Sequence, residues 1–128
     1  MKIGIIGFGR LGKLIVKNLA QDFELVVYDK IDMSREIKEA GATAGSLEEV
    51  CKAKIVIPFV PISEFENVIK KIAPLVTADC LVLDVCSVKL HPTKIMYQYL
   101  PKNIQILGTH PMFGPDSAKT TMMGCKIV

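Results

Sequence analysis

The chain has 128 residues, of which 50% are hydrophobic and 23% charged, and its formal net charge is +3. This composition is typical of one globular domain with its own hydrophobic core, and it excludes a disordered tail, a collagen-like repeat and a disulfide-stabilised miniprotein. The charges are nearly balanced and form no basic run, so the sequence does not indicate a nucleic-acid-binding groove.

Short β-branched runs alternate with amphipathic stretches of helical length along the whole chain. The runs predict strands at residues 2–6, 24–28, 54–57, 81–85, 104–107 and 125–128. The amphipathic stretches predict helices at residues 10–21 and 34–40, from 46 onward, from 63 onward, and at 92–99. Strands that are apolar along their whole length and alternate with helices indicate a parallel sheet with helices on both faces. The sequence therefore predicts a single doubly wound α/β domain.

Two Ser-x-x-Glu patterns predict where helices begin. Ser46 with Glu49, and Ser63 with Glu66, each have the spacing of a capping box, in which both side chains bond free N–H groups at the helix start. Gly41 follows an earlier predicted helix in the usual place for a helix stop. These signals set the predicted boundaries of three helices.

The first predicted strand runs directly into a Gly-x-Gly-x-x-Gly motif in which the first helix begins. Its residues are Gly7, Phe8, Gly9, Arg10, Leu11 and Gly12. In this motif the first glycine allows a tight turn, the second lets the backbone approach a pyrophosphate, and the third lets helix and strand pack closely. N–H groups at the helix N-terminus then attract the phosphates. The motif predicts a Rossmann-type dinucleotide-binding site to which these six residues contribute.

Asp29 ends the second predicted strand, 22 residues after Gly7. A carboxylate at this place accepts hydrogen bonds from the adenosine ribose and repels a 2′-phosphate, which favours NAD over NADP. The neighbouring cations Lys30 and Arg35 keep NADP open, because either could pair with a 2′-phosphate. We expect NAD as the cofactor, with Asp29 and Lys30 at its adenosine end.

The ligand crevice of a doubly wound sheet lies at the carboxyl ends of its strands. Three further segments reach this edge, at residues 59–61, 86–89 and 108–115. The first of them adds Phe59, Val60 and Pro61 to the expected cofactor site.

The other two segments contribute the candidate catalytic residues. Ser87 and His110 follow adjacent strands, so both could face one nicotinamide. His110 lies at a strand's carboxyl end in a stiff loop rich in Pro and Gly, whereas His91 precedes Pro92 at a helix start. We therefore interpret His110 as functional and His91 as structural.

Two strings of residues at this edge are similar to those of a known family. From Thr109 to Pro115 the chain reads Thr-His-Pro-Met-Phe-Gly-Pro, and from Asp84 to Lys89 it reads Asp-Val-Cys-Ser-Val-Lys. Together with the glycine loop, they resemble prephenate/arogenate dehydrogenase of tyrosine biosynthesis over essentially the whole chain. The resemblance implies an NAD(P)-dependent oxidoreductase that oxidatively decarboxylates prephenate or arogenate.

The resemblance also implies roles for individual residues. The family's histidine bonds the ring hydroxyl that is oxidised, which maps onto His110, and its serine orients that hydroxyl and the nicotinamide, which maps onto Ser87. Neutral His110 would accept the hydroxyl proton as hydride leaves to the nicotinamide, and carbon dioxide is then lost. Lys89 either adds positive potential for an anionic substrate or is an ordinary surface lysine.

The family has a helical C-terminal domain that dimerises and supplies an arginine to the substrate carboxylate. We interpret residues 1–128 as the NAD(P)-binding Rossmann domain cut from such a protein, inactive alone and a homodimer at full length through the missing helical domain. Plant-type arogenate enzymes carry Ser-Arg after the second strand, where this chain has Asp29 and Lys30. Their NADP preference is therefore not carried over.

Targeting signals and cysteine spacing bear on the compartment. The stretch before Gly7 is too short for the apolar part of a signal peptide, and no apolar run is long enough to cross a bilayer. The four cysteines form no Cys-x-x-Cys pair and have no zinc-type spacing, which favours buried thiols over disulfides or ligands. We expect a cytoplasmic protein with a small-molecule substrate and without metal, membrane or nucleic-acid partners.

Two other functions fit the same residues. A nucleotide-sensing regulatory domain would bind NAD(H) without chemistry, which accounts for the glycine loop but not for the His-Pro-Met-Phe-Gly-Pro loop. Another nicotinamide-dependent reductase, of the hydroxyacid or imine type, would share the fold and differ in this loop. Cofactor binding without substrate turnover would favour the regulatory domain.

Overall fold

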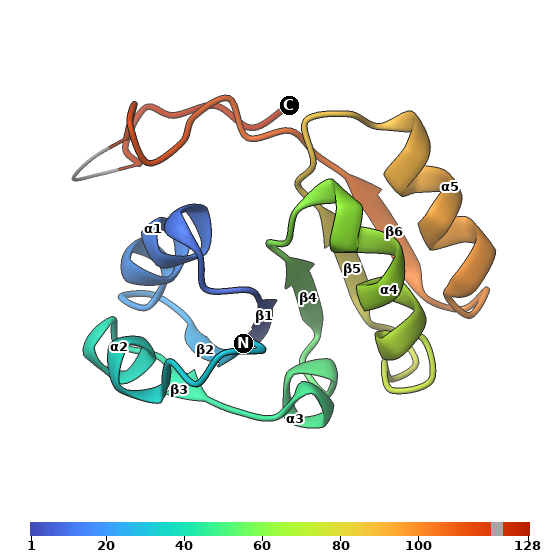
Figure 1. The fold of residues 1–128 in the computed structure, drawn as a ribbon, viewed down its shortest axis with the longest axis horizontal. Helices are drawn as coiled ribbons and strands as arrows, with labels where there is room; N and C mark the ends of the chain where they lie inside the picture. The colour runs from blue at the N-terminus through green and yellow to red at the C-terminus, as the bar shows by residue number, and fades with distance from the viewer. Residues whose placement is uncertain (119–121) are drawn as a thin grey trace.

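The computed structural model describes residues 1–118 and 122–128, and within them six strands form one parallel sheet (Figure 1). The strands are β1 (Lys2–Ile6), β2 (Glu24–Tyr28), β3 (Thr43–Ala44), β4 (Ile55–Pro58), β5 (Leu81–Asp84) and β6 (Gln105–Gly108). Their order is β3-β2-β1-β4-β5-β6, so the chain first moves outward from β1 on one side and then outward on the other. This doubly wound order confirms the predicted Rossmann-type fold.

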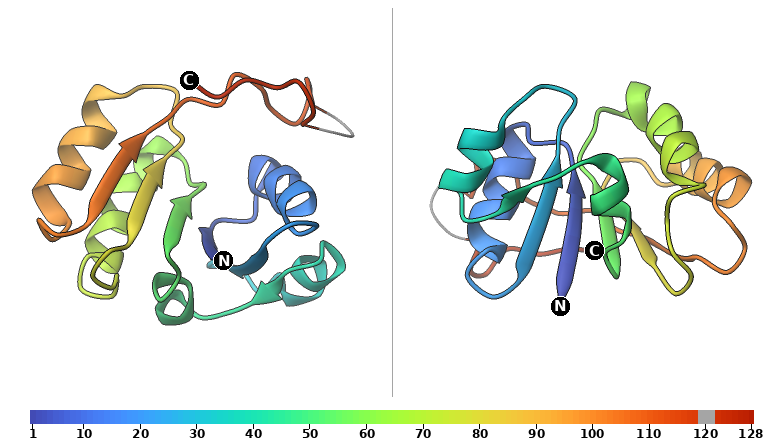
Figure 2. Two further views of the ribbon diagram at one scale, coloured as in Figure 1. Left: turned by 180° about the vertical axis from the view of Figure 1, so that it is seen from behind. Right: turned by 90° about the horizontal axis from the view of Figure 1, so that it is seen from below.

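Five helices connect these strands along the described chain. They are α1 (Arg10–Leu19), α2 (Ser34–Glu39), α3 (Leu47–Cys51), α4 (Ile62–Ile72) and α5 (Leu90–Tyr99). Helices α1 and α2 pack on one face of the sheet, and α3, α4 and α5 pack on the other; Figure 2 shows the arrangement from two further sides. None of the helices that the structure describes combines the length and apolarity needed to cross a membrane.

The strands divide their side chains between two hydrophobic cores. In β1, Ile3 and Ile5 belong to the core beneath α1, while Ile6 belongs to the core beneath α4 and α5. β4 divides in the same way, with Ile57 in the first core and Val56 in the second. Successive side chains of a strand point to opposite faces, and helices cover both faces here. The inner strands β1 and β4 are therefore apolar along almost their whole length rather than alternating with polar residues.

Most predicted elements are confirmed, with ends that shift by one or two residues. β4 and β6 begin one residue later than predicted, α1 ends two residues earlier, and α5 begins two residues earlier. The first capping box is present: the Glu49 N–H donates to the Ser46 hydroxyl at 3.2 Å, and the Ser46 N–H donates to the Glu49 carboxylate at 2.7 Å. Gly41 follows α2 with a φ of +91°, as a helix stop requires.

The second predicted capping box, at Ser63 and Glu66, is wrong. Helix α4 begins at Ile62, with Pro61 as its N-cap residue and no side-chain cap hydrogen bond. Pro61, with φ −56° and ψ 149°, takes the N-cap position two residues before Ser63, so the first helical residue is Ile62. Glu66 instead accepts a hydrogen bond from the hydroxyl of Tyr99 at 2.9 Å.

The predicted strand at residues 125–128 is also wrong, because this segment does not join the parallel sheet. It runs antiparallel to the loop that follows β6, with one bridge between Pro111 and Ile127. His110 and Val128 exchange both backbone hydrogen bonds, at N···O distances of 2.7 and 3.0 Å. Residues with strand propensity can pair with any backbone whose N–H and C=O groups are free. Here that backbone belongs to the loop after β6 and not to β6 itself. Strand β3, of two residues, is too short for periodicity to predict.

Candidate functional site

The glycine loop lies between the end of β1 and the start of α1. Gly7 has a φ of +101°, which side chains rarely adopt, and a Cβ there would collide with the carbonyl oxygen of Phe59. Gly12 packs against the same turn, because a Cβ there would collide with the carbonyl oxygen of Gly7. Both positions therefore require glycine for reasons internal to the fold.

Gly9 differs from the other two glycines of the motif. Its backbone is extended, with φ −75° and ψ −164°, and a Cβ there would meet no described atom within 4 Å apart from its chain neighbours. The packing of the described residues therefore does not explain this glycine. Gly9 is the N-cap of α1, and the missing side chain leaves the free N–H groups of the helix N-terminus open to a ligand.

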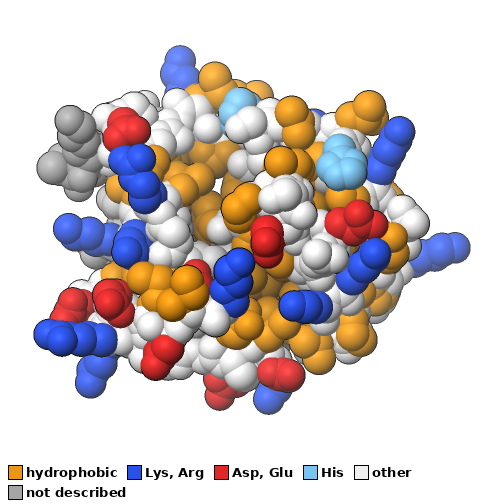
Figure 3. All heavy atoms as spheres, viewed as in Figure 1, with side chains coloured by type: hydrophobic (Ala, Val, Ile, Leu, Met, Phe, Trp, Pro, Cys, Tyr) orange, Lys and Arg blue, Asp and Glu red, His pale blue; other side chains and the backbone are white. Residues whose placement is uncertain are grey.

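A cavity of about 470 Å³ opens beside this helix N-terminus, at the carboxyl edge of the sheet. The glycine loop forms one side and the chain after β4 and β5 forms the other; the lining residues are Gly9, Arg10, Leu11, Gly12, Phe59, Val60, Pro61, Ile62, Val85, Cys86, Ser87 and Val88. Figure 3 shows the surface hollowed between the half that carries α1 and the half that carries α4. The structure thus brings Ser87 together with most of the residues that the sequence predicted for the cofactor.

Four of the predicted cofactor residues, Gly7, Phe8, Asp29 and Lys30, are not among the lining of this cavity. The Asp29 carboxylate accepts the N–H of Phe8 at 2.7 Å and the N–H of Ile31 at 2.9 Å, so it ties the end of β2 to the glycine loop. The Phe8 side chain is buried in the core beneath α1. Lys30 is exposed, with its ammonium 3.7 Å from a carboxylate oxygen of Glu64. Asp29 and Phe8 therefore hold the backbone of the glycine loop in place, Asp29 by a hydrogen bond and Phe8 by packing in the core.

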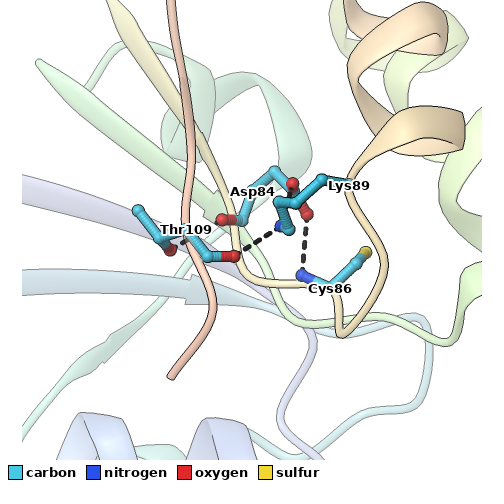
Figure 4. Close-up of polar contacts among 4 residues, drawn as sticks. All are labelled: Asp84, Cys86, Lys89 and Thr109. Atoms are coloured by element: carbon cyan, nitrogen blue, oxygen red, sulfur yellow. Dashed lines mark hydrogen bonds and ion pairs between the residues drawn. The ribbon is translucent and has the colours of Figure 1, made fainter. Parts of the chain in front are cut away.

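A buried carboxylate stands at the end of β5. Asp84 is 0% exposed; it pairs with the ammonium of Lys89 and accepts the N–H of Cys86 at 2.7 Å (Figure 4). Lys89 also donates to the carbonyl oxygen of Thr109, the residue after β6. Burial, and then the hydrogen bond to Asp84 and its charge, raise the pKa of the Cys86 thiol to about 12. Cys86 thus lines the cavity as a protonated thiol at neutral pH.

His110 follows Thr109 in the loop after β6. Because β5 and β6 are paired, the loops that carry Ser87 and His110 leave adjacent strands, as predicted. Ser87 is exposed and lines the cavity, whereas His110 is partly buried and is not among the lining residues. The neighbours of His110, Thr109 and Pro111, line a second, apolar hollow of about 290 Å³. The structure brings the two loops together without placing both side chains in one cavity.

Sequence reasoning did not single out all residues of this edge. Val85, Cys86 and Val88 belong to the Asp84–Lys89 string but were given no role in the site, and they line the cavity beside Ser87. Asp84 had one usable signal, a carboxylate at the end of an otherwise apolar strand. Within residues 1–118 and 122–128, no three His, Cys, Asp or Glu side chains gather in a way that could hold a metal ion, and the four cysteines are free.

A doubly wound sheet, a glycine loop at the N-terminus of α1 and a cavity at the carboxyl edge together define a nucleotide-binding Rossmann domain. A family model described as "Prephenate dehydrogenase, nucleotide-binding domain" matches residues 15–123. The chain belongs to this family, which confirms the resemblance inferred from its motifs.

Three known proteins that this chain resembles are considerably longer than it. A protein of Methanocaldococcus jannaschii named "Probable arogenate/prephenate dehydrogenase" is 36% identical over 118 residues, which cover 89% of this chain and 26% of that protein. Arogenate dehydrogenase of Synechocystis matches with a TM-score of 0.77 and 25% identity, over 87% of this chain and 41% of that one. Prephenate dehydrogenase of Aquifex aeolicus, solved with hydroxyphenyl propionate and NAD+, matches with a TM-score of 0.75 and 22% identity, over 88% and 42%. The chain spans less than half the length of each.

Proposed function

We propose that this chain is the cofactor-binding, catalytic half of an NAD-dependent dehydrogenase that oxidatively decarboxylates prephenate or arogenate in tyrosine biosynthesis. One observation carries the proposal: Gly9, at the open N-terminus of α1, and Ser87 both line the cavity at the carboxyl edge of the sheet. Membership of the prephenate dehydrogenase family and the names of the relatives support the substrate class.

The residues around the glycine loop fit a dinucleotide, and they favour NAD. Each oxygen of the Asp29 carboxylate accepts one backbone N–H and keeps a lone pair for a ribose hydroxyl. The two cations that could bind a 2′-phosphate already have acidic partners: Lys30 lies 3.7 Å from Glu64, and Arg35 lies 3.2 Å from Glu39. The A. aeolicus relative solved with NAD+ supports the same cofactor.

Ser87 and His110 carry the proposed chemistry. Bound NAD supplies the hydride acceptor. His110, in its neutral form, accepts the proton of the ring hydroxyl, and Ser87 orients that hydroxyl by a hydrogen bond. The bond from the ring to its carboxylate then breaks, carbon dioxide leaves, and the electron pair makes the ring aromatic. That the two residues follow the paired strands β5 and β6 supports this assignment.

The proposal includes a second, helical domain that completes the substrate site and forms a homodimer. The relatives of known structure are more than twice as long as this chain, which supports a further domain in the active protein. The four free cysteines support a reducing compartment such as the cytoplasm.

Turnover by the protein at its full native length tests the proposal. We expect NADH formation with prephenate or arogenate, at least about tenfold more efficient than with NADP because Asp29 repels the 2′-phosphate. His110→Asn should lower turnover by about 1000-fold, the usual contribution of a general base, and leave the NAD dissociation constant unchanged. The matched control is His91→Asn, an exposed position in the first turn of α5, which should keep full turnover.

The outcomes separate the competing functions. Tight NAD binding without turnover of either compound would contradict the dehydrogenase and favour a nucleotide-sensing domain. Turnover of hydroxyacids or imines instead would favour a different nicotinamide-dependent reductase. Full activity in His110→Asn would remove His110 from the mechanism.

A further inference from the structure

We propose that Asp84 and Lys89 act together as a positioning pair, which holds the Ser87 loop and the His110 loop in one fixed arrangement. The pair itself touches neither substrate nor cofactor in this proposal, which rests on the proposed dehydrogenase function. It acts through the backbone of the two loops. Figure 4 shows the contacts that carry the proposal.

The first contacts bind the Ser87 loop to the carboxylate. Asp84 is the last residue of β5 and is 0% exposed, and its Oδ1 accepts the N–H of Cys86 at 2.7 Å. Its Oδ2 pairs with the Nζ of Lys89. The chain between these two contacts consists of Cys86, Ser87, Val88 and Lys89. Ser87 therefore lies in a short loop that is held at both ends by the same buried carboxylate.

The second contacts bind the chain before His110. Thr109 is buried, with 8% exposure, and both its N–H and its hydroxyl donate to the backbone oxygen of Asp84, at 2.8 and 2.7 Å. Its own carbonyl oxygen accepts a hydrogen bond from Lys89. Each polar atom of Thr109 is thus bonded to Asp84 or Lys89. Two of these bonds go to the backbone oxygen of Asp84, and the third comes from the ammonium of Lys89. Since His110 is the next residue, the Lys89 bond ties the start of its loop to the pair.

Gly108 borders the lysine stem, although a Cβ there would make only ordinary van der Waals contacts. Gly108 stands opposite Asp84 in the β5–β6 register, and a Cβ there would lie 3.5 Å from the Cδ of Lys89 and 3.7 Å from Oδ2 of Asp84. Two of the three N–H donors of the ammonium are committed to the Asp84 carboxylate and the Thr109 carbonyl. These commitments favour a positioning role for Lys89 over direct attraction of an anionic substrate.

Losing the lysine alone would leave a buried carboxylate without its counter-charge, which is strongly destabilising. The test therefore compares Lys89→Met with the double variant Asp84→Asn/Lys89→Met, in which no charge is left unpaired. Lys94→Met, an exposed lysine of α5, is the matched control. All are made in the protein at its full native length.

We expect the folded double variant to lose about 100-fold in kcat, because displacing reacting groups by about 1 Å costs that much. The KM for the substrate and the NAD dissociation constant should stay within about twofold, since the cofactor-binding residues of the glycine loop are untouched. Lys94→Met should match the wild type. A folded double variant with wild-type kcat would overturn the proposal, as would a loss confined to KM.

Hydrogen–deuterium exchange of the same proteins gives a readout that does not depend on turnover. In the double variant the amides of Cys86 and Thr109 keep their acceptors, but the Lys89 bonds to residue 84 and to the Thr109 carbonyl are lost, so the two loops should open more easily. Both amides should then exchange at least about tenfold faster, while those of β1 and β2 remain protected. Unchanged exchange at both amides would overturn the positioning role. If the wild type binds NAD but turns over neither compound, the proposed function fails, and the exchange data still decide whether the pair holds the loops.

Discussion

The glycine loop and the paired loops after β5 and β6 lie at the same edge of the sheet but are held in different ways. The glycine loop is shaped by backbone atoms: Gly7 and Gly12 leave room for the carbonyl oxygens of Phe59 and Gly7. The loops after β5 and β6 are held by an ion pair between the buried carboxylate of Asp84 and the partly exposed Lys89. The glycine loop therefore depends on the missing side chains of Gly7 and Gly12, and the loops after β5 and β6 depend on the charges of Asp84 and Lys89.

This difference predicts how each region fails. In the glycine loop, adding a methyl group is the disruptive change. Its effect on stability depends on whether the methyl group would point into the backbone, as at Gly12, or into open space, as at Gly9. In the β5–β6 loops, removing the Lys89 side chain does the damage, because the buried Asp84 carboxylate then has no counter-charge. Of the three predictions below, in order of decreasing effect, two test the glycine loop and the third tests whether the two regions are coupled.

Gly12→Ala should cause the largest loss of stability. Its Cβ would collide with the carbonyl oxygen of Gly7, a backbone atom that cannot move without opening the turn between β1 and α1. We expect the free energy of unfolding to fall by about 3 kcal/mol, the upper range for overpacking a tight site. Urea denaturation measures it, and a midpoint equal to that of the wild type would contradict the close packing of α1 on this turn.

Gly9→Ala should separate cofactor binding from folding. The extended backbone of Gly9 suits any residue, and its Cβ would point into open space, so stability should stay within about 0.5 kcal/mol of the wild type. The methyl group would occupy space beside the helix N-terminus, and we expect NAD affinity to fall about tenfold, or about 1.4 kcal/mol. Calorimetric titration with NAD checks this, and unchanged affinity would mean that the phosphates lie elsewhere.

Asp116→Asn should have the smallest effect. Asp116 pairs with Arg10 at 2.6 Å and so connects the glycine loop with the chain after His110, but the two side chains are 84% and 72% exposed. Exposed pairs contribute little and are screened by salt, so we expect a change below about 0.5 kcal/mol at physiological ionic strength. Thermal unfolding at low and high salt measures it. A larger loss, or one that persists in high salt, would mean that the two regions are coupled through this pair.

Patterns in adjacent residues predicted which segments meet beside the glycine loop. The motif from Gly7 to Gly12 and the residues Phe59 to Pro61 were expected at one edge, and the structure brings most of them into one cavity. The reason is physical: a strand, a tight turn and a helix start are local structures, and the carboxyl ends of parallel strands meet at one edge.

Long-range partners limited what could be predicted on the other side. Lys89 had two interpretations from the sequence, and its contacts with Asp84 and Thr109 now favour a positioning role. The capping box expected at Ser63 failed because Pro61 starts the helix first. A pattern of two or three residues indicates which hydrogen bonds or ion pairs a side chain is able to form. Which of them forms depends on the residues that the fold brings next to it.

By itself, the sequence determined the doubly wound fold, the glycine loop and the family, since these depend on apolar periodicity and on residues that are close in the chain. Only the tertiary structure decided that residues 125–128 pair with the loop after β6, and that Asp84 and Lys89 join the Ser87 and His110 loops. Both features join parts of the chain that are distant in sequence. A buried charge takes whichever counter-charge the fold brings to it, and no local pattern encodes that partner.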